Sequence, residues 1–461
     1  MESSTRSCDN RYLSVASDAW SRMPSTRRTF LTAAVAVTAG CTGRRSGTTT
    51  TETGTDTTDE TTTTPPTSGS DDAPSFVHWS REMPHDELGL LSLGGGPETP
   101  AIFVGSAASD DESTDADHAI HALSLQDGGE KWRTDVSNPV QTAPRYAGTG
   151  ETPRIVFATG QESLHGKAFQ IQSVDYDSGE RLWQFDIDDR RFLYPIVTSE
   201  ETVIVGRRDD QLYESGEYVY ALDVSNGDER WRTETGDVSE SGNARRRDTL
   251  FVKTLRRVRA YGLEDGDERW QTTAETVGYD NRGERVFVEA DDTVRALKRT
   301  DGTELWQREF DNGTSGIATP REAMDGTVFV GGSDGQLLAL SPLDGETRWT
   351  LSIGSDNFWP SVERTSEQLF VAGSGVHAVD PVSGERQWSF TPDGEGYVNV
   401  DVSQTVFART KQHLWALDPE TGEKRWQFAP GSRFAGVASA GDFAFVAVNG
   451  RVYALDGSES T

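Results

Sequence analysis

The residues with the clearest capacity for chemistry are clustered carboxylates. Asp110, Asp111 and Glu112, followed by Asp115 and Asp117, form the densest acidic stretch of the chain. Oxygen ligands of this kind suit Ca²⁺. The stretch lacks the glycine and the alternate spacing of a calcium-binding loop, so a solvated acidic loop is the favoured interpretation.

Histidine and cysteine give no stronger candidate for a metal or catalytic site. His118 and His121 come nearest to metal-ligand spacing but have no third ligand in view, so we expect the histidines to hold structural positions on strands. The seven histidines are His78, His85, His118, His121, His165, His377 and His413. Both cysteines, Cys8 and Cys41, precede the patterned part of the chain, which therefore has no disulfide and no thiolate metal site. We predict no catalytic residue and no metal ligand.

The charge balance is strongly acidic. The 461 residues include 75 Asp and Glu against 44 Lys and Arg, a formal net charge of −31. Such a charge strains a compact fold by self-repulsion in dilute buffer, but the screening length falls to about 3 Å near 1 M salt. We interpret the acidity as adaptation to high salt, with an acidic cation-binding surface as the alternative. Nucleic acid is excluded as a partner because it requires a basic face.

One eleven-residue frame organises the rest of the chain. It is Ala416-Leu417-Asp418-Pro419-Glu420-Thr421-Gly422-Glu423-Lys424-Arg425-Trp426: a short apolar strand, a turn containing Asp, Pro and Gly, and a returning strand that carries Trp. Further copies end at Trp231, Trp349 and Trp388, and weaker copies end at Trp132, Trp183, Trp270 and Trp306. Eight copies with Gly four residues before Trp indicate an internal repeat.

The segments between the tryptophans complete a four-stranded unit. Between Trp306 and Trp349, for example, β-like runs occupy 316–319, 327–331 and 336–340. Four strands at a period near 40 residues are typical of a propeller blade. The chain ends on a third strand, Arg451 to Asp456, and the body opens on a Trp strand, Phe76 to Trp79, so the two can pair and close a ring. The predicted fold is an all-β propeller of four-stranded antiparallel blades, eight or nine in number, with nine as the literal count.

The amino-terminal part has the composition of a targeting signal and a linker. Arg27 and Arg28 lie in a stretch that resembles a twin-arginine export motif, and Thr38-Ala39-Gly40-Cys41 resembles a lipobox with Cys41 as the lipidated residue. The alternative is a plain signal peptide, and Met23 is a second candidate start. We predict an extension and signal over 1–41, a Thr-rich disordered linker over 42–74 and the propeller over 75–461. Asn312 begins the one glycosylation sequon of the body.

The repeated frame resembles the PQQ-like repeat of quinoprotein-type β-propellers, over about Phe76 to Asp456. In that family the blade tryptophan stacks on a neighbouring peptide plane and joins the blades. By resemblance this role belongs to Trp79, Trp132, Trp183, Trp231, Trp270, Trp306, Trp349, Trp388 and Trp426. The usual family ring has eight blades, from which the literal count of nine departs.

The resemblance implies two functional classes. One is the quinone-dependent dehydrogenases, which need Ca²⁺ and, in the alcohol enzymes, an adjacent Cys pair that this body lacks. The other is catalytically silent and includes the bacterial outer-membrane assembly lipoprotein. Export signal, lipobox Cys, tether and ring together resemble the second class. We therefore expect a non-catalytic, extracytoplasmic protein-binding scaffold, anchored to the membrane through Cys41. The alternatives are a dehydrogenase that uses pyrroloquinoline quinone (PQQ) and Ca²⁺, and a cell-surface sensor or adhesion module.

The partner expectations follow from the same class. We expect other proteins as partners, a monomeric ring and no bound cofactor, since no set of residues matches the PQQ and Ca²⁺ ligand motifs. One local feature opposes the global charge and is a candidate partner-binding patch if its members converge in space: Arg207, Arg208, Arg245, Arg246, Arg247, Arg256 and Arg257. The alternative is local pairing with Asp209, Asp210 and Asp248. Trp359 could line the channel and stack on a ligand, although packing is the favoured interpretation, and Trp415 is predicted to pack in the core.

Overall fold

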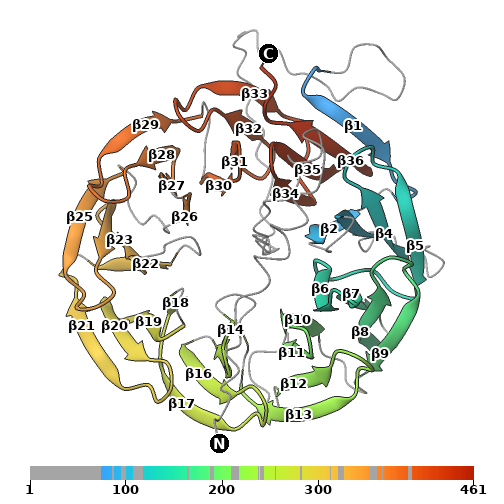
Figure 1. Ribbon diagram of the computed structural model, residues 1–461, viewed down its shortest axis with the longest axis horizontal. Helices are drawn as coiled ribbons and strands as arrows, with labels where there is room; N and C mark the ends of the chain where they lie inside the picture. The colour runs from blue at the N-terminus through green and yellow to red at the C-terminus, as the bar shows by residue number, and fades with distance from the viewer. Residues whose placement is uncertain are drawn as a thin grey trace, which may run out of the picture.

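The protein is a closed ring of nine four-stranded antiparallel sheets in the part of the chain that the computed structural model describes (Figure 1). The described residues are 74–85, 88–94, 100–106, 118–163, 166–186, 192–208, 218–236, 238, 243–254, 256–280, 283–311, 313–319, 326–353, 361–365, 367–392 and 397–460. They contain no helix. Both the propeller class and the count of nine blades are confirmed.

Each blade is one sheet, and blades are numbered here from the first complete one. Blades 1 to 3 comprise β2 Leu88–Gly94, β3 Ala101–Ser106, β4 His118–Ser124, β5 Glu130–Val136; β6 Arg145–Thr149, β7 Thr152–Ser163, β8 Gly166–Asp175, β9 Arg181–Asp186; β10 Phe192–Thr198, β11 Thr202–Arg208, β12 Tyr218–Asp223, β13 Glu229–Glu234. Blades 4 to 6 comprise β14 Ala244–Arg246, β15 Thr249–Lys253, β16 Arg257–Gly262, β17 Glu268–Thr273; β18 Thr276–Tyr279, β19 Arg285–Ala290, β20 Thr293–Lys298, β21 Glu304–Glu309; β22 Thr314–Ala318, β23 Val328–Gly332, β24 Gln336–Leu340, β25 Thr347–Ser352.

Blades 7 and 8 comprise β26 Ser361–Arg364, β27 Leu369–Ala372, β28 Val376–Val379, β29 Arg386–Phe390; β30 Asn399–Val402, β31 Val406–Arg409, β32 Leu414–Leu417, β33 Lys424–Phe428. Blade 9 joins the two ends of the body. It comprises β34 Gly436–Ala440, β35 Phe443–Val448, β36 Arg451–Asp456 and, from the amino-terminal side, β1 Val77–Glu82. The predicted closure by pairing of the end strands is therefore confirmed.

The strands of each blade run outward from the ring centre in sequence order. Figure 1 shows β2, β6, β10 and the other first strands innermost, with β5, β9, β13 and the other Trp strands on the rim. The second strand of each blade is buried on both faces, as in β15, because neighbouring blades cover it. The side chains of alternating strand residues form nine apolar clusters among the described residues, and each cluster lies between two adjacent blades.

The register of the two outer strands is the same in all nine blades. Trp426 lies opposite Ala416, with a register shift directly after that pair, and Trp79 lies opposite Ala454 in the blade that closes the ring. In blade 2 the small residue is Ser173, opposite Trp183. A small residue opposite the indole leaves the ring free to lie against the next blade, so the register positions every tryptophan at a blade junction.

Candidate functional site: the blade junctions and the ring seam

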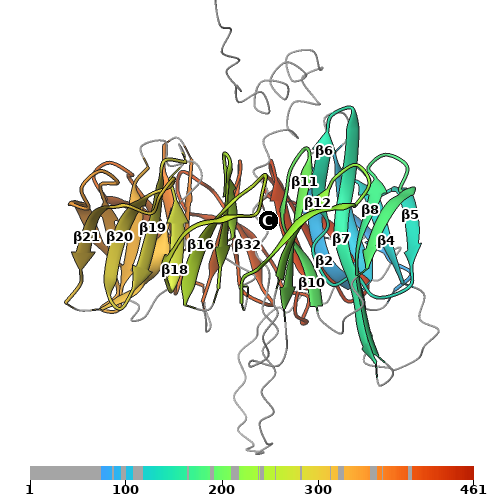
Figure 2. The same cartoon turned by 90° about the horizontal axis from the view of Figure 1, so that it is seen from below.

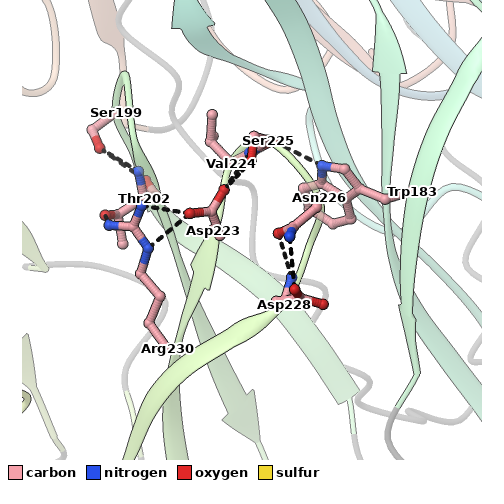
Figure 3. Close-up of polar contacts among 9 residues, drawn as sticks. All are labelled: Trp183, Ser199, Thr202, Asp223, Val224, Ser225, Asn226, Asp228 and Arg230. Carbon is pink, nitrogen blue, oxygen red and sulfur yellow. Dashed lines mark hydrogen bonds and ion pairs between the residues drawn. The ribbon is translucent and has the colours of Figure 1, made fainter.

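The junction between blades 2 and 3 shows how a tryptophan joins two blades (Figure 3). Trp183 Nε1 donates a hydrogen bond of 2.8 Å to the carbonyl oxygen of Val224, in the turn of the next blade. An indole bond to a turn carbonyl occurs at all nine junctions, with the acceptor at the seam one position earlier in the frame. The bonds run from Trp79, Trp132, Trp183, Trp231, Trp270, Trp306, Trp349, Trp388 and Trp426 to the carbonyls of Leu125, Tyr176, Val224, Leu263, Arg299, Pro342, Pro381, Pro419 and Asp456.

A turn glycine receives the indole face at eight of these junctions. At Gly422, with φ of +73°, an added Cβ would lie 2.5 Å from Trp388. Both the positive φ and the close approach favour glycine. The other seven are Gly128, Gly179, Gly227, Gly266, Gly302, Gly345 and Gly384, each against the tryptophan of the preceding blade. The Gly and Trp of the repeat are thus partners across blades, not within one.

A carboxylate, an arginine and a threonine hold the turn itself. In blade 3, Asp223 accepts hydrogen bonds from the amide and the hydroxyl of Ser225 and forms an ion pair of 2.6 Å with Arg230 (Figure 3). Arg230 also donates a hydrogen bond of 3.1 Å to the hydroxyl of Thr202. The Ser225 hydroxyl first, and Arg230 after it, lower the pKa of Asp223 to about 2, although burial opposes the shift. The same three roles fall to Asp418, Arg425 and Thr405 in blade 8. The hydrogen bonds and ion pairs of these carboxylates therefore stabilise the turns of the fold.

Blade 4 shows what happens when the turn aspartate is missing. Gly262 stands at that position, and Arg269 pairs instead with Asp248, at 3.0 Å. Asp248 also pairs with Arg299 of blade 5. Burial opposes ionisation of Asp248, but the hydrogen bonds from the two arginines lower its pKa to about 2.

The seam between blades 8 and 9 has a different construction. The ring of Phe76 stacks on Trp426 at a centroid distance of 4.7 Å and an interplanar angle of 13°. The amide of Asp456 donates a hydrogen bond of 2.7 Å to the carbonyl of Phe76. This bond between the two ends of the propeller body corresponds to the bond from the amide of Asp418 to the carbonyl of Glu423 within blade 8. Phe76 is only 4% exposed. Phe76 thus takes the place of the residues that, in the other blades, follow the third strand in a continuous turn.

Three titratable side chains meet beside the first blade. His121 on β4 is fully buried, and its Nδ1 lies 3.0 Å from Glu130 Oε2. Its Nε2 lies 3.2 Å from Nε2 of His85, in the connection that follows β1. Burial lowers the pKa of His121, and Glu130 opposes that shift. The sequence drew attention to His118 beside His121, but His118 instead contacts Ser106.

The candidate arginine patch does not gather on one face. β15 runs from the hairpin tip that follows Arg246 to the turn that precedes Arg257, so Arg245–Arg247 and Arg256–Arg257 lie at opposite ends of blade 4. Arg207 and Arg208 end β11, at the same end as Arg256. Arg246 lies over the ring of Tyr279, 5.0 Å from its centroid. Of the three suggested local partners, Asp209 and Asp210 lie outside the described residues, and Asp248 pairs with Arg269 and Arg299.

Several sequence candidates lie outside the described residues. They are Arg27, Arg28, Cys41, the acidic loop 110–117, His165, Asn312 and Trp359. Trp415, by contrast, is 4% exposed within the cluster between blades 7 and 8, as core packing requires.

Sequence reasoning missed a second aromatic row. An aromatic residue of the second strand is fully buried against the blade tryptophan, as Phe329 is against Trp349 with a centroid distance of 5.7 Å. The row consists of Phe103, Phe251, Phe287, Phe329, Phe370, Phe407 and Phe445, with Val156 at the same position in blade 2 and Ile204 in blade 3. Its signal was a Phe in the middle of an apolar run, 18 to 20 residues before the Trp of blades 4 to 8.

The described residues include no group of three or more His, Cys, Asp or Glu side chains that could hold a metal ion. In the same residues, no helix is long and apolar enough to cross a membrane.

Comparison with known proteins gives one family. The family model described as outer membrane protein assembly factor BamB matches residues 77–208, 215–374 and 372–461. No curated protein matches the chain.

Among solved structures, BamB from Moraxella catarrhalis is 16% identical, with a TM-score of 0.46, over 68% of this chain and 93% of that one. The computationally designed Ika8 protein is 13% identical, with a TM-score of 0.46, over 65% and 93%. Quinohemoprotein alcohol dehydrogenase ADHIIG from Pseudomonas putida HK5 is 13% identical, with a TM-score of 0.44, over 84% and 76%.

Proposed function

The chain belongs to the family of the outer membrane protein assembly factor BamB, and from that premise we propose that it is a protein-binding scaffold. The ring is rigid because every blade is bonded to the next by an indole and a buried apolar cluster. A rigid ring holds its loops at fixed positions, which suits docking of other proteins.

The observation that carries this proposal is the hairpin of β7 and β8. These are the longest strands of the described chain, and they stay paired to Ser163 opposite Gly166. β6 pairs with β7 only as far as Val156, and β9 pairs with β8 only from Gln170 onward. Figure 2 shows the hairpin projecting beyond the disc of the ring.

The projecting end has the features of a β-strand docking element. Backbone bonds from the 139–141 segment cover β7 only as far as Gly160. No strand among the described residues pairs with the outer edges of the last three residue pairs, Gln161–Ser163 with Gly166–Ala168. Unpaired edge amides and carbonyls can accept a further strand from a partner protein. We therefore place the main docking contact of the scaffold at this hairpin.

Shortening the hairpin tests the proposal. Residues 161–168 are replaced by Asn-Gly, which joins Gly160 to its pairing partner Phe169 by a two-residue turn without changing the register. The expected result is loss of a defined crosslinked partner at the membrane, with the Tm of the ring unchanged. The control replaces Asn449-Gly450, the tip of the short β35–β36 hairpin, by Asp-Gly. Undiminished crosslinking in the shortened variant would rule out the hairpin as the docking element.

We also propose that the protein is extracytoplasmic and attached to the membrane by a lipid on Cys41, after export that depends on Arg27 and Arg28. The support is the lipobox-like stretch together with the family, because these residues lie outside the described part. Cys41→Ser should release the protein from the membrane fraction, and the double variant R27K/R28K should retain it inside the cell. Membrane attachment that survives Cys41→Ser would contradict the anchor.

The scaffold is proposed to act without a quinone. Calorimetric titration of the body with PQQ and Ca²⁺ in molar salt should show no binding. Tight binding that depends on Ca²⁺ would favour the dehydrogenase alternative instead.

A further inference from the structure

The pair formed by His85 and His121 sits where the first blade meets the closing strand. His85 follows β1, which belongs to blade 9, and His121 lies in β4 of blade 1. Arg81 of β1 donates to the carbonyl of Gly128 and lies 3.6 Å from Glu130, so the same neighbourhood joins the two blades by other bonds. The two imidazoles therefore link the segments that begin and complete the ring.

The tautomer of His121 is set by its carboxylate. Glu130 accepts a hydrogen bond, so the Nδ1 atom of His121 carries the proton and its Nε2 presents a lone pair towards His85. His85 donates from Nε2 in the hydrogen-bonded form. If His85 takes the other tautomer, with its proton on Nδ1, the Nε2 atoms of both histidines present lone pairs to the space between the rings. Neither imidazole has to lose a net proton for this.

The separation of the two nitrogens fits a metal ion. Two imidazole ligands at about 2.0–2.1 Å from a tetrahedral Zn²⁺ have their nitrogens about 3.3 Å apart. The two Nε2 atoms are 3.2 Å apart, and the ring planes are inclined by 60°. A carboxylate on the far nitrogen of a ligating histidine is also the usual way in which proteins orient such a ligand. Glu130 supplies that contact.

The position is unusual within the repeat. His121 directly precedes the small residue opposite Trp132, and His377 holds the same place in blade 7. His377 Nδ1 contacts the hydroxyl of Ser389 at 2.9 Å. Elsewhere the place is held by Gln172, Tyr220, Arg259, Arg295, Leu338, Trp415 and Tyr453. Among the described residues, blade 1 is the only blade in which a histidine at this position contacts another histidine.

We propose that His85 and His121 form a two-histidine site for a borderline divalent cation of the Zn²⁺ class, oriented by Glu130. The described residues supply two ligands, so water completes the coordination and the ion exchanges readily. Arg81 and Arg133 lie near enough to oppose a cation, and Glu130 offsets part of that charge. Bound metal would fasten the connection after β1 to blade 1 and so strengthen ring closure.

Calorimetric titration with Zn²⁺ tests the site on chelator-treated, full-length protein in molar salt. His85→Ala should weaken the tightest binding event at least tenfold, and Glu130→Gln should weaken it by about 10–100-fold. His377→Ala is the matched control and should leave the Zn²⁺ affinity unchanged. Mg²⁺ controls for the many surface carboxylates, because it prefers oxygen ligands and should not compete. His85 lies in a connection, so its removal should leave the ring folded.

A spectroscopic measurement distinguishes imidazole from carboxylate binding. Cu²⁺ bound at one equivalent should show hyperfine coupling to two nitrogens by electron paramagnetic resonance, and to one in His85→Ala. Zn²⁺ affinity that is equal in wild type and His85→Ala, or a Cu²⁺ spectrum without nitrogen coupling, would overturn the proposal and leave a hydrogen-bonded histidine pair.

Discussion

Eight blade junctions and the seam solve the same packing problem with different residues. At the junction of blades 7 and 8, Trp388 lies against Gly422, and the turn that carries this glycine is continuous chain. At the seam, Trp426 also bonds to a turn carbonyl, but to that of Asp456, one position earlier in the frame than the acceptor Pro419 in blade 8. Its ring face meets Phe76 from the other end of the body. The turn frame is complete in both cases.

The difference teaches that the frame depends on contacts and not on peptide continuity. The side chains of Arg451 and Ser80, which lie on the two closing strands, meet across 371 residues of sequence. Such a contact must offset the entropy of closing the whole ring. A large stacked aromatic pair adds apolar burial at the place where a covalent turn is missing. The seam should therefore be the junction at which a single truncation has its largest local effect.

The largest expected effect comes from Phe76→Ala. Loss of a buried phenylalanine costs about 3–5 kcal/mol, and here the loss falls on ring closure. We expect amide exchange to accelerate in β36 and β1 well before the other blades, measured by hydrogen exchange with mass spectrometry. Phe76→Leu, which keeps most of the apolar volume, should restore most of the protection. Uniform acceleration around the ring would show that the seam is not a separate weak point.

The covalent junctions should respond to a single methyl group. Gly422→Ala places a Cβ against Trp388 at a positive φ, and should lower the free energy of unfolding by about 2–4 kcal/mol. Gly431 has a similar φ of +78° with nothing within 4 Å of an added Cβ. Gly431→Ala should cost only about 1–2 kcal/mol, from backbone strain. Denaturant midpoints in molar salt measure both, and equal costs would mean that indole contact does not require the glycine.

Acid should act on a junction away from the seam through His377. Burial first, and Arg386 after it, lower its pKa from the ordinary value of 6.5 to about 4. The folded state then binds fewer protons than the unfolded chain between these values, so stability is complete above pH 6.5 and falls as the pH drops towards 4. The loss amounts to about 3 kcal/mol at most.

His377→Gln is the test of that assignment. Glutamine can still bond to Ser389 but does not titrate, so the slope of Tm against pH between 6.5 and 4 should flatten relative to wild type. An unchanged slope would assign the acid sensitivity to another group, such as His121 beside the closing strand.

The smallest effect should be the same at the two kinds of junction. Trp183→Phe and Trp426→Phe each remove one indole hydrogen bond, of 2.8 and 2.7 Å, and leave a carbonyl without that donor. Each should cost about 1–2 kcal/mol. A markedly larger cost for Trp426→Phe would mean that the stack on Phe76, rather than the shared hydrogen bond, holds the seam.

The blade count and the closure could be predicted because their signal repeats. Eight pairs of Gly and Trp, four residues apart, mark eight blades, and Trp79 marks the ninth, whose strands come from the two ends of the body. The seven arginines of the candidate patch do not all share one face, for the opposite reason. Arg245–Arg247 and Arg256–Arg257 are close in sequence, but a single strand between them carries the chain from one face of the ring to the other.

The sequence by itself determined the turn chemistry, the strand period and the repeated tryptophan, to which resemblance to the PQQ-like repeat assigned the role of joining each blade to the next. These depend on local conformation, such as the positive φ at Gly422, and on one repeated contact. Only the tertiary structure decided which glycine receives each indole, that Phe76 stacks on Trp426, and that His85 rather than His118 meets His121. Those pairings join residues of different blades or of the two ends of the propeller body. Their proximity follows from ring closure, because no local spacing in the sequence encodes it.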